Sequence, residues 1–287
     1  MSSFSLFSAA GESRPLFETP PEPSARKLPG SVANVVPASR LEIRPAPEMA
    51  SSGVIEIDNW TGGLPRGCLT EVSGSTSSGR TSLLLAVLAA ATQRQEACAL
   101  VDVSDTFDPQ SAARAGVCFE KLLWIRCGVS EVQNYQARLR PDSFSGNKKI
   151  FPETPVEQAL RVTDLLLQSS GFGMVAIDLG DTPLKWARRI PLASWFRFQR
   201  AVEKTPTVLF VVTPAPCAQT CATLAMKLTA KKLSAVSYQP PAKAPAHSQL
   251  LDGLHIESEL LRSRLERKPA RSAAATFTSK AIRTGSD

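Results

Sequence analysis

The sequence of 287 residues contains only two histidines, His247 and His255. Both lie in the C-terminal region. A Ser-His-Asp hydrolase needs a histidine as its general base, and a histidine metal site needs several imidazoles. We therefore expect neither hydrolase chemistry nor a histidine metal cluster from this chain.

Cysteine pairs of the C-x-x-C type are absent. The six cysteines stand at positions 68, 98, 118, 127, 217 and 221, several of them within apolar runs. Cys217 and Cys221 are spaced to share one face of a helix, but two thiols alone make a poor metal site. Without C-x-x-C spacing, neither a zinc site nor a redox motif is indicated. We expect buried, reduced thiols, which are typical of a cytosolic protein.

A secretory signal and a membrane-spanning run are also missing. The first fifteen residues carry no basic start and no sustained apolar stretch. The longest apolar run, LLLAVLAAA after Ser82, is far shorter than the roughly 20 residues that a spanning helix needs. These features predict a soluble, cytoplasmic protein without a membrane partner.

Composition divides the chain into three regions. Residues 1–52 form a Pro-rich leader, since eight of the 22 prolines lie among the first 50 residues, and such a segment is expected to be disordered. Residues 53–265 are the predicted core, and residues 266–287 a basic, flexible tail. From Lys227 onward the sequence contains eleven Lys or Arg and five Asp or Glu, so this region carries +6 of the net charge of +7. This excess suits a nucleic-acid backbone or an acidic partner; the alternative is solvated charge without a role.

Short apolar strands alternate with helices through the predicted core. Strands are predicted at residues 68–73, 97–103, 121–127, 173–179 and 207–213, and helices at residues 80–95, 154–170 and 190–204. This alternation gives right-handed crossovers and an α/β fold, with a mainly parallel twisted sheet and helices on both of its faces. Residues 224–238 and 253–265 are more charged and more alternating, which predicts antiparallel strands at the C-terminal edge of the sheet.

A glycine-rich loop follows the first of these strands and opens the first helix. Its sequence, GSTSSGRTS, has the frame G-x-x-x-x-G-[K]-[ST] of a phosphate-binding loop, with arginine in place of lysine. Backbone N–H groups of such a loop converge on phosphate oxygens, and the helix N-terminus adds its dipole. The candidate nucleotide-binding residues are Gly74, Ser75, Thr76, Ser77, Ser78, Gly79, Arg80, Thr81 and Ser82.

Magnesium has two candidate ligands beside this loop. Thr81 offers the hydroxyl that coordinates the ion in phosphate-binding loops. Asp178 ends an apolar strand at the carboxyl edge of the sheet, where ligands bind in such folds, and its carboxylate could hold the ion through water. The alternative for Asp178 is a simple strand-terminating aspartate. ATP and magnesium are thus the cofactors that the motif suggests, and Arg80 puts both in question.

Longer stretches around the loop carry a family resemblance. GVIEIDNWTGGLPRGCLTEVSGSTSSGRTSLLLAVLAAA and ACALVDVSDTFDPQSAARAGVCFEKLLWIRC resemble the nucleotide-binding core of RecA recombinases, from about Gly53 to Cys127. The later stretch GFGMVAIDLGDTPLKWARRIPLASWFRFQRAVEKTPTVLFVVTPAP is more similar to a divergent branch, the ImuA-type proteins, which accompany translesion DNA synthesis in the bacterial damage response. The resemblance implies a RecA-like P-loop core.

Three departures from the RecA pattern bear on activity. Arg80 replaces the lysine, and its longer, planar guanidinium does not fit the slot of a compact ammonium between the terminal phosphates. Ser104 stands where the resemblance places a catalytic glutamate, with Asp105 one position late; losing a general base costs roughly 10²–10⁴ in rate. Thr213 and Pro214 occupy the region of the family's phosphate-sensing glutamine, and the DNA-binding loop after them is shortened. We expect a weak or absent ATPase and assign no catalytic residue.

Basic and aromatic residues mark a candidate surface for DNA or a partner protein. Residues 185–200 are expected to place Leu192, Trp195 and Phe196 on one helical face, with arginines on the polar side. Such a surface stacks on single-stranded bases or docks on a protein; the alternative is an amphipathic helix on the sheet, with its arginines in water. The candidate residues, including those of the C-terminal region, are Arg188, Arg189, Trp195, Arg197, Arg200, Arg262, Arg264, Arg267 and Lys268.

The resemblance implies an accessory protein of the bacterial DNA-damage (SOS) response that supports error-prone translesion synthesis. Its implied partners are polymerase-type proteins of that response and RecA itself, and single-stranded DNA is a further candidate. The alternative is an active DNA-dependent ATPase of RecA type, acting in homologous recombination and strand exchange. A third reading is a regulator that binds nucleotide without hydrolysing it.

Overall fold

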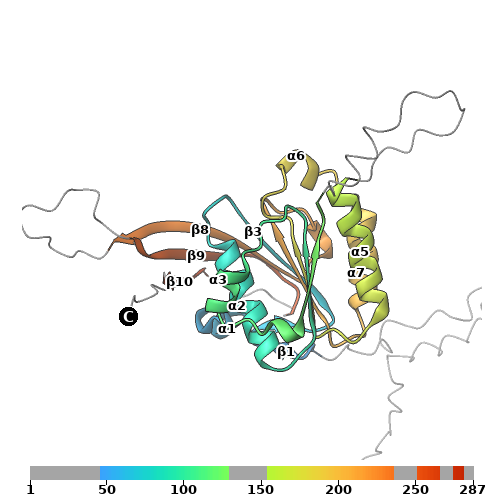
Figure 1. Ribbon diagram of the computed structural model, residues 1–287, viewed down its shortest axis with the longest axis horizontal. Coiled ribbons are helices and arrows are strands. Elements are labelled where there is room, and N and C mark those ends of the chain that lie inside the picture. Colours follow the sequence, from blue (N-terminus) through green and yellow to red (C-terminus); the bar gives the residue numbers. More distant parts are fainter. Residues whose placement is uncertain (1–45, 129–153, 236–250, 266–273, 281–287) are drawn as a thin grey trace, which may run out of the picture. The chain divides into compact units, whose positions relative to one another are not determined.

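The structure is a computed structural model that describes residues 46–128, 154–235, 251–265 and 274–280. Most of the predicted leader and part of the predicted tail lie outside these residues. Within them, an eight-stranded sheet carries helices on both faces (Figure 1). This confirms the predicted α/β fold class.

The elements follow one another as the sequence pattern indicates. The strands of the large sheet are β3 (Cys68–Gly74), β4 (Cys98–Asp102), β5 (Leu122–Arg126), β6 (Met174–Asp178), β7 (Val208–Thr213), β8 (Leu224–Ala235), β9 (Leu251–Ser263) and β10 (Ala274–Lys280). The helices are α1 (Ile55–Thr61), α2 (Arg80–Gln93), α3 (Pro109–Arg114), α5 (Pro155–Ser169), α6 (Leu184–Ala187) and α7 (Leu192–Val202), with single 3-10 turns η3 (Phe119–Lys121) and η4 (Gln219–Cys221). Two short strands, β1 (Met49–Ala50) and β2 (Leu64–Pro65), pair separately.

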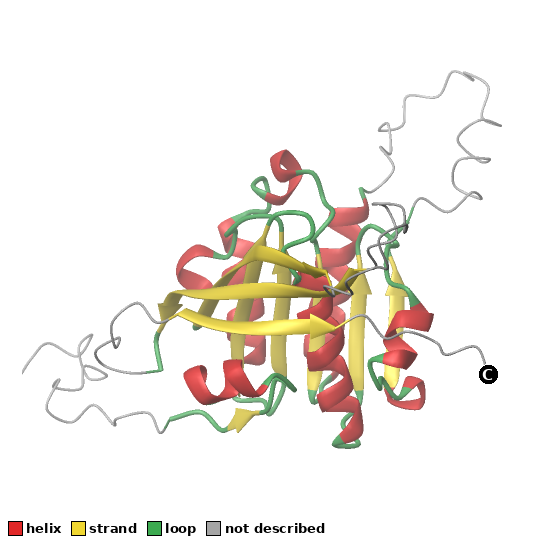
Figure 2. Cartoon of the chain, turned by 90° about the vertical axis from the view of Figure 1, so that its left-hand side faces the viewer, coloured by secondary structure: helices red, strands yellow, loops and turns green. Residues whose placement is uncertain are grey.

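The strand order of the large sheet is β10-β9-β8-β3-β7-β6-β4-β5. Every pair from β8 to β5 is parallel, and the two outer pairs, β8–β9 and β9–β10, are antiparallel. Parallel strands end at one edge of the sheet, so the residues that follow β3, β4, β6 and β7 meet there. Figure 2 shows the three C-terminal strands turned across the direction of the parallel strands behind them.

The two strands predicted at the C-terminal edge, β8 and β9, pair antiparallel, which confirms that prediction, and β8 also pairs in parallel with β3 on its other side. One feature of this edge differs from the sequence prediction. The predicted flexible tail contains β10, which pairs with β9 and buries Phe277. A single apolar side chain in a polar, basic stretch gives little periodicity, which is why the sequence did not indicate this strand.

Apolar layers cover both faces of the sheet. One contains α1, α2 and α3, and the other contains α5 and α7. Ile256 of β9 and Phe277 of β10 also belong to the first layer, so α2 is enclosed between the sheet and the C-terminal strands. A helix that is covered on several sides is apolar all round, which explains the run LLLAVLAAA. No described helix is long and apolar enough to cross a membrane.

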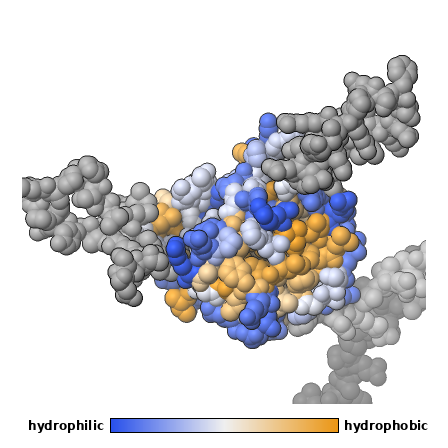
Figure 3. Space-filling model, in the orientation of Figure 1, coloured by the Kyte–Doolittle hydropathy of each residue, from blue (hydrophilic) through white to orange (hydrophobic). Residues whose placement is uncertain are grey.

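The edge of the sheet at β5 exposes apolar side chains to solvent. Figure 3 shows apolar and charged residues interspersed on one face of the molecule, with a large apolar area over β5 and α5. Leu123 of β5 is 48% exposed and Leu165 of α5 is 61% exposed. α5 itself begins with a capping box, in which the Thr154 hydroxyl accepts from the Glu157 N–H and the Glu157 side chain accepts from the Thr154 N–H.

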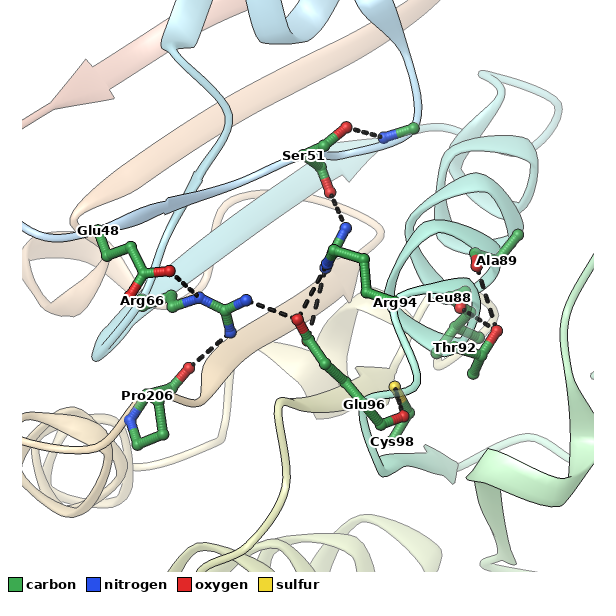
Figure 4. A network of polar contacts seen from close by, with 11 residues as sticks. Glu48, Ser51, Arg66, Leu88, Ala89, Thr92, Arg94, Glu96, Cys98 and Pro206 are labelled. Carbon is green, nitrogen blue, oxygen red and sulfur yellow. Dashed lines mark hydrogen bonds and ion pairs between the residues drawn. The ribbon is translucent and has the colours of Figure 1, made fainter.

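An arginine network fastens the amino edge of the parallel strands (Figure 4). Arg66, between β2 and β3, donates from Nη1 to the Pro206 carbonyl at 2.9 Å and from Nη2 to Glu96 Oε1 at 2.6 Å. Its Nε lies 3.3 Å from Glu48 Oε1, and Arg94 also donates to Glu96, at 2.9 Å. Burial opposes ionisation of Glu96, but the hydrogen bonds from the two arginines outweigh it and lower the pKa of its carboxyl. One guanidinium therefore joins the segments that enter β3, β4 and β7.

Candidate functional site

β3 leads into the glycine-rich loop at the carboxyl edge of the sheet, and α2 begins at Arg80 directly after it. The loop leaves no room for side chains at its two glycines. A Cβ on Gly74 would lie 2.4 Å from Ser78 Oγ, and one on Gly79, whose φ is 92°, would lie 2.2 Å from Ile256 Cδ1. The loop is therefore packed closely on its own backbone and against β9.

The hydroxyl groups of the loop divide into an open and a closed set. The open set is exposed at the surface and consists of Ser75, Thr76, Ser77 and Thr81. Ser78 is buried and its Oγ has no hydrogen-bond partner among the described residues. Ser82, in the first turn of α2, accepts a hydrogen bond from Ser279 of β10 at 3.1 Å. Thr81, one of the two predicted magnesium ligands, is thus exposed to solvent.

Arg80 points into the protein and is only 6% exposed. Its Nη1 donates to the Gly180 carbonyl at 2.7 Å and to the Thr213 carbonyl at 3.2 Å, and its Nη2 lies 3.6 Å from Asp181 Oδ1. These groups follow β6 and end β7. The guanidinium therefore joins the helix after β3 to the carboxyl ends of two other strands, and both of its Nη groups contact the chain itself.

Two carboxylates lie on neighbouring strands beside Arg80, because Asp102 of β4 and Asp178 of β6 are register partners. Asp178 accepts a hydrogen bond from the Gly180 N–H at 2.8 Å, and burial raises the pKa of its carboxyl to about 6. Asp102 is fully buried and accepts from the N–H groups of Thr106 and Phe107. Asp102 therefore shapes the loop after β4, and Asp178 is the carboxylate nearer to the surface.

The loop after β4 offers no general base at the positions that the sequence singled out. Ser104 is a hydroxyl at the wall of a surface pocket. Asp105 has a φ of 56° and accepts two hydrogen bonds from Arg126, both at 2.6 Å. These bonds lower the pKa of the Asp105 carboxyl, which makes it a poor proton acceptor. The carboxylate of Asp105 is instead engaged by Arg126.

The end of β7 is held by a carboxylate that the sequence analysis did not single out. Glu71 of β3 is 1% exposed, and its Oε1 accepts from the N–H groups of Cys217 and Ala218 at 2.6 and 3.1 Å. It also accepts from the Thr213 hydroxyl at 3.2 Å. Burial raises the pKa of Glu71 above its usual range, although these hydrogen bonds oppose the rise. The short loop after β7 is thus anchored from inside the sheet.

Basic residues from separate segments gather around this anchored loop. Arg188 and Arg189 line a pocket of about 500 Å³ together with Cys217 and Gln219. Arg262 of β9 donates a hydrogen bond to the Gln219 carbonyl. Arg264, two residues further on, is exposed, and its backbone N–H donates to the Thr223 carbonyl. The structure therefore brings together four of the arginines that the sequence selected in two different regions, and we call them the basic surface.

Other members of the selected set lie elsewhere. Trp195 is fully buried against Phe198 and cannot stack on a base or meet a partner, which corrects the sequence prediction. The face of α7 that packs on the sheet runs through Trp195, Phe198 and Val202, whereas Phe196 is 44% exposed. Arg197 is exposed but pairs with Asp164 of α5. Arg200 is exposed on α7, and Arg267 and Lys268 lie outside the described residues.

Comparison with known proteins agrees with this geometry. Residues 30–134 match the model of the RecA N-terminal domain. Over 134 residues the chain is 34% identical to protein RecA of Pseudomonas fluorescens (strain SBW25), of Pseudomonas savastanoi pv. phaseolicola (strain 1448A / Race 6) and of Pseudomonas putida. Each match covers 47% of this chain and 30% of the RecA protein.

The fold has a RecA-like core. The residues that match the RecA N-terminal domain include the glycine-rich loop, Arg80 and Ser104. Asp178, Thr213 and the basic surface lie beyond them, and the matched region spans about a third of the length of those RecA proteins. Homology is therefore clearest around the phosphate loop.

Three residues with a clear part in this geometry were missed by the sequence analysis: Glu71, Asp102 and Arg66. Glu71 carried a signal, because an acidic residue in the middle of the apolar strand sequence CLTEVS must find partners when it is buried. Asp102 likewise ends the apolar run ACALVD. Nothing local marks Arg66, since its partners stand up to 140 residues away along the chain.

Proposed function

We propose that this protein is a RecA-like accessory factor of the bacterial DNA-damage response, which supports error-prone translesion synthesis without acting as an ATP-driven recombinase. The observation that carries the proposal is the position of Arg80. Its guanidinium is tied to two carbonyls and one carboxylate of the chain itself. Hydrolysis of a nucleotide needs a cation that is free to meet the developing charge on the terminal phosphate.

The bound nucleotide that the loop suggests fits the site only in part. The glycine positions and the exposed Thr81 hydroxyl suit a phosphate cradle and a magnesium ligand. Asp178 has a free carboxylate oxygen beside its bond to Gly180, although its burial disfavours the charged form. Ser104 and Asp105 supply no base. Any Mg-ATP held here is therefore proposed to be a structural ligand.

The basic surface supports a direct role at DNA. Arg188 and Arg189 have no carboxylate within 4.0 Å in the described part of the chain, so their charges face solvent and suit phosphate groups. Single-stranded DNA is tracked by such positively charged grooves. The later stretch of the sequence that is more similar to ImuA-type proteins, residues 171–216, contains both arginines and supports the assignment to translesion synthesis over recombination.

The proposal is tested by comparing mutagenesis with recombination in cells that lack the gene. Loss of the protein is expected to reduce damage-induced mutation frequency at least tenfold and to leave homologous recombination unchanged. Complementation with the Arg188→Ala/Arg189→Ala variant is expected to restore mutagenesis only partly. A fall in recombination frequency together with DNA-stimulated ATP turnover by the purified protein would instead identify an active recombinase.

A further inference from the structure

A second pocket lies beside α6, whose Trp186 forms part of its wall. It has a volume of about 460 Å³ and opens where β4, β5 and the first turn of α5 meet. Its walls are mainly apolar and come from Val103, Cys127, Pro155, Val156, Pro183 and Trp186. This volume is in the range of sites that hold a ligand or a pair of large side chains.

The pocket also contains an unsatisfied polar group. Thr182 is 5% exposed and forms part of the wall, and its Oγ1 has no hydrogen-bond partner among the residues described. A buried hydroxyl without a partner is unfavourable, and this oxygen is enclosed by the protein, so the wall offers a bound molecule mainly apolar surface. Ser104 is a further wall residue. Because a serine stands here, where the RecA resemblance places a glutamate, the wall has no negative charge at this position.

The rim of the pocket is positive. Lys185 Nζ and Arg189 Cζ lie over the Trp186 ring, 5.8 and 5.3 Å from its centroid. Neither cation has a carboxylate within 4.0 Å in the ranges that the structure covers, whereas the nearby acids Asp105 and Asp181 are already paired with Arg126 and Arg80. Acidic groups of a bound molecule would meet unpaired cations here.

We propose that this pocket binds a short segment of a partner protein in which one or two large apolar side chains stand between acidic residues. Leu184 and Trp186 are each 39% exposed, so the apolar surface continues outside the pocket, as a peptide needs and a small metabolite does not. A nucleobase fits less well, because two cations already lie over the Trp186 ring and the walls carry few groups to read a base edge. Tryptophan and arginine are the side chains most often found at the energetic centre of protein interfaces.

This inference rests on the proposed accessory role, since it names the chemistry of a partner, but it needs neither nucleotide nor DNA. The test selects a displayed library of nine-residue random peptides on the full-length protein. The enriched peptides are then synthesised, and their affinity is measured by fluorescence anisotropy. We expect enrichment of one or two aromatic or aliphatic residues flanked by Asp or Glu.

Variants locate the site of binding. Trp186→Ala removes the largest apolar side chain of the wall, and Ser104→Glu places a negative charge in it. Each variant is expected to bind the selected peptides at least tenfold more weakly. Phe196→Ala is the matched control, because this exposed aromatic of α7 lies outside the pocket, and it is expected to bind as the natural protein does. Circular dichroism confirms that each variant is folded.

The proposal is overturned if no acid-flanked apolar peptides are enriched, or if all four proteins bind them equally. It is also overturned if labelled oligothymidylate displaces the peptides and depends on Trp186 in the same way, because the pocket would then serve a nucleobase. Absence of ATP turnover or of a mutagenesis phenotype would not produce any of these results, so the two proposals fail separately.

Discussion

At the scale of single residues, the buried Arg80 and the partly buried Arg66 perform the same task at opposite edges of the sheet. Arg66 joins the segments that enter β3, β4 and β7, and Arg80 joins the segments that follow β6 and end β7. A planar guanidinium presents several N–H groups in a fixed geometry, which a lysine cannot reproduce. Arg80 thus has a structural role that a lysine at the same position of the loop would not fill.

Replacement of Arg80 by lysine is expected to destabilise the protein. A lysine ammonium in this position can reach only some of the groups that the guanidinium contacts. The Gly180 or the Thr213 carbonyl is then left without its donor. A buried polar group that loses its partner costs about 1–3 kcal/mol. Urea unfolding should therefore show a lower free energy of unfolding for Arg80→Lys than for the natural protein. Equal stability would mean that the guanidinium contacts contribute nothing.

Asp178 predicts a pH dependence with a definite sign. Because burial raises the pKa of Asp178 to about 6 in the folded protein, the folded state holds a proton that the unfolded chain releases near pH 4. The contribution of this group to stability is complete below about pH 4 and is lost as pH rises through about 6. At pH 7 the charged carboxylate costs on the order of 3 kcal/mol by this linkage.

The Asp178→Asn variant removes this charge and keeps an oxygen for the Gly180 N–H. It should therefore be more stable than the natural protein at pH 7–8, and the advantage should disappear near pH 4. Thermal unfolding of both proteins across this range measures the difference. An advantage that does not change with pH would show that Asp178 carries no such burial cost.

At the scale of elements, α7 has a different buried face from the one that the sequence indicated. The burial of Trp195, Phe198 and Val202 gives a measurable prediction. Trp195→Ala should lower the free energy of unfolding by about 3–5 kcal/mol, as for large core side chains in general. Phe196→Ala, on the exposed side, should change it by no more than about 0.5 kcal/mol. Denaturant melts of the two variants decide which face packs on the sheet, and the reverse order would contradict this assignment.

The loop after β7 depends on a carboxylate in β3. Glu71→Leu removes the acceptor for the N–H groups of Cys217 and Ala218 and leaves two buried donors unpaired. We expect a loss of at least about 2 kcal/mol in stability and much faster amide hydrogen exchange at Cys217 and Ala218. Exchange that is unchanged in this loop would show that Glu71 does not anchor it.

Most of the elements could be predicted from the sequence, because the core strands are short apolar runs between amphipathic or apolar helices. The apolar run followed by the glycine-rich loop predicted the positions of β3 and α2. The alternation of strands and helices predicted the parallel sheet. β10 was missed because its pairing with β9 depends on tertiary contacts, with Phe277 as its one large apolar residue. The direction of β8 also depends on its neighbours, since a strand carries no local signal for the side on which it pairs.

The candidate site was less predictable than the fold. The sequence identified Arg80, Ser104 and the pair Thr213 and Pro214 as departures. It could not show where the Arg80 side chain goes, because Gly180 and Thr213 are 100 and 133 residues away. The meeting of Arg188, Arg189 and Arg262 around Gln219 was likewise hidden. Trp195 was misassigned because the predicted face grouped it with the exposed Phe196, whereas it packs on the sheet with Phe198 and Val202.

At the scale of the whole molecule, the basic surface brings together arginines from two distant parts of the sequence. If the basic surface tracks a single strand, each phosphate that it neutralises contributes about 0.7 to the slope of log affinity against log salt. Arg188→Ala/Arg189→Ala should therefore weaken oligothymidylate binding and reduce the slope by roughly 1.4. Arg197→Ala/Arg200→Ala removes the same charge from α7 and should leave the slope unchanged. Equal effects of both double variants would assign binding to net charge alone.

The central claim is that the RecA-like core is retained while the Arg80 contacts withdraw the phosphate loop from ATP chemistry. Its most direct test is the equilibrium binding of Mg-ATP to the natural protein, to Arg80→Lys and to Arg66→Lys, a control that removes the other guanidinium that joins strand ends. The account predicts affinity weaker than about 1 mM for the natural protein and for Arg66→Lys, and at least tenfold tighter binding for Arg80→Lys because its ammonium is free to meet phosphate. Micromolar binding by the natural protein, weakened by Arg80→Lys, would contradict it and make Arg80 part of a working nucleotide site.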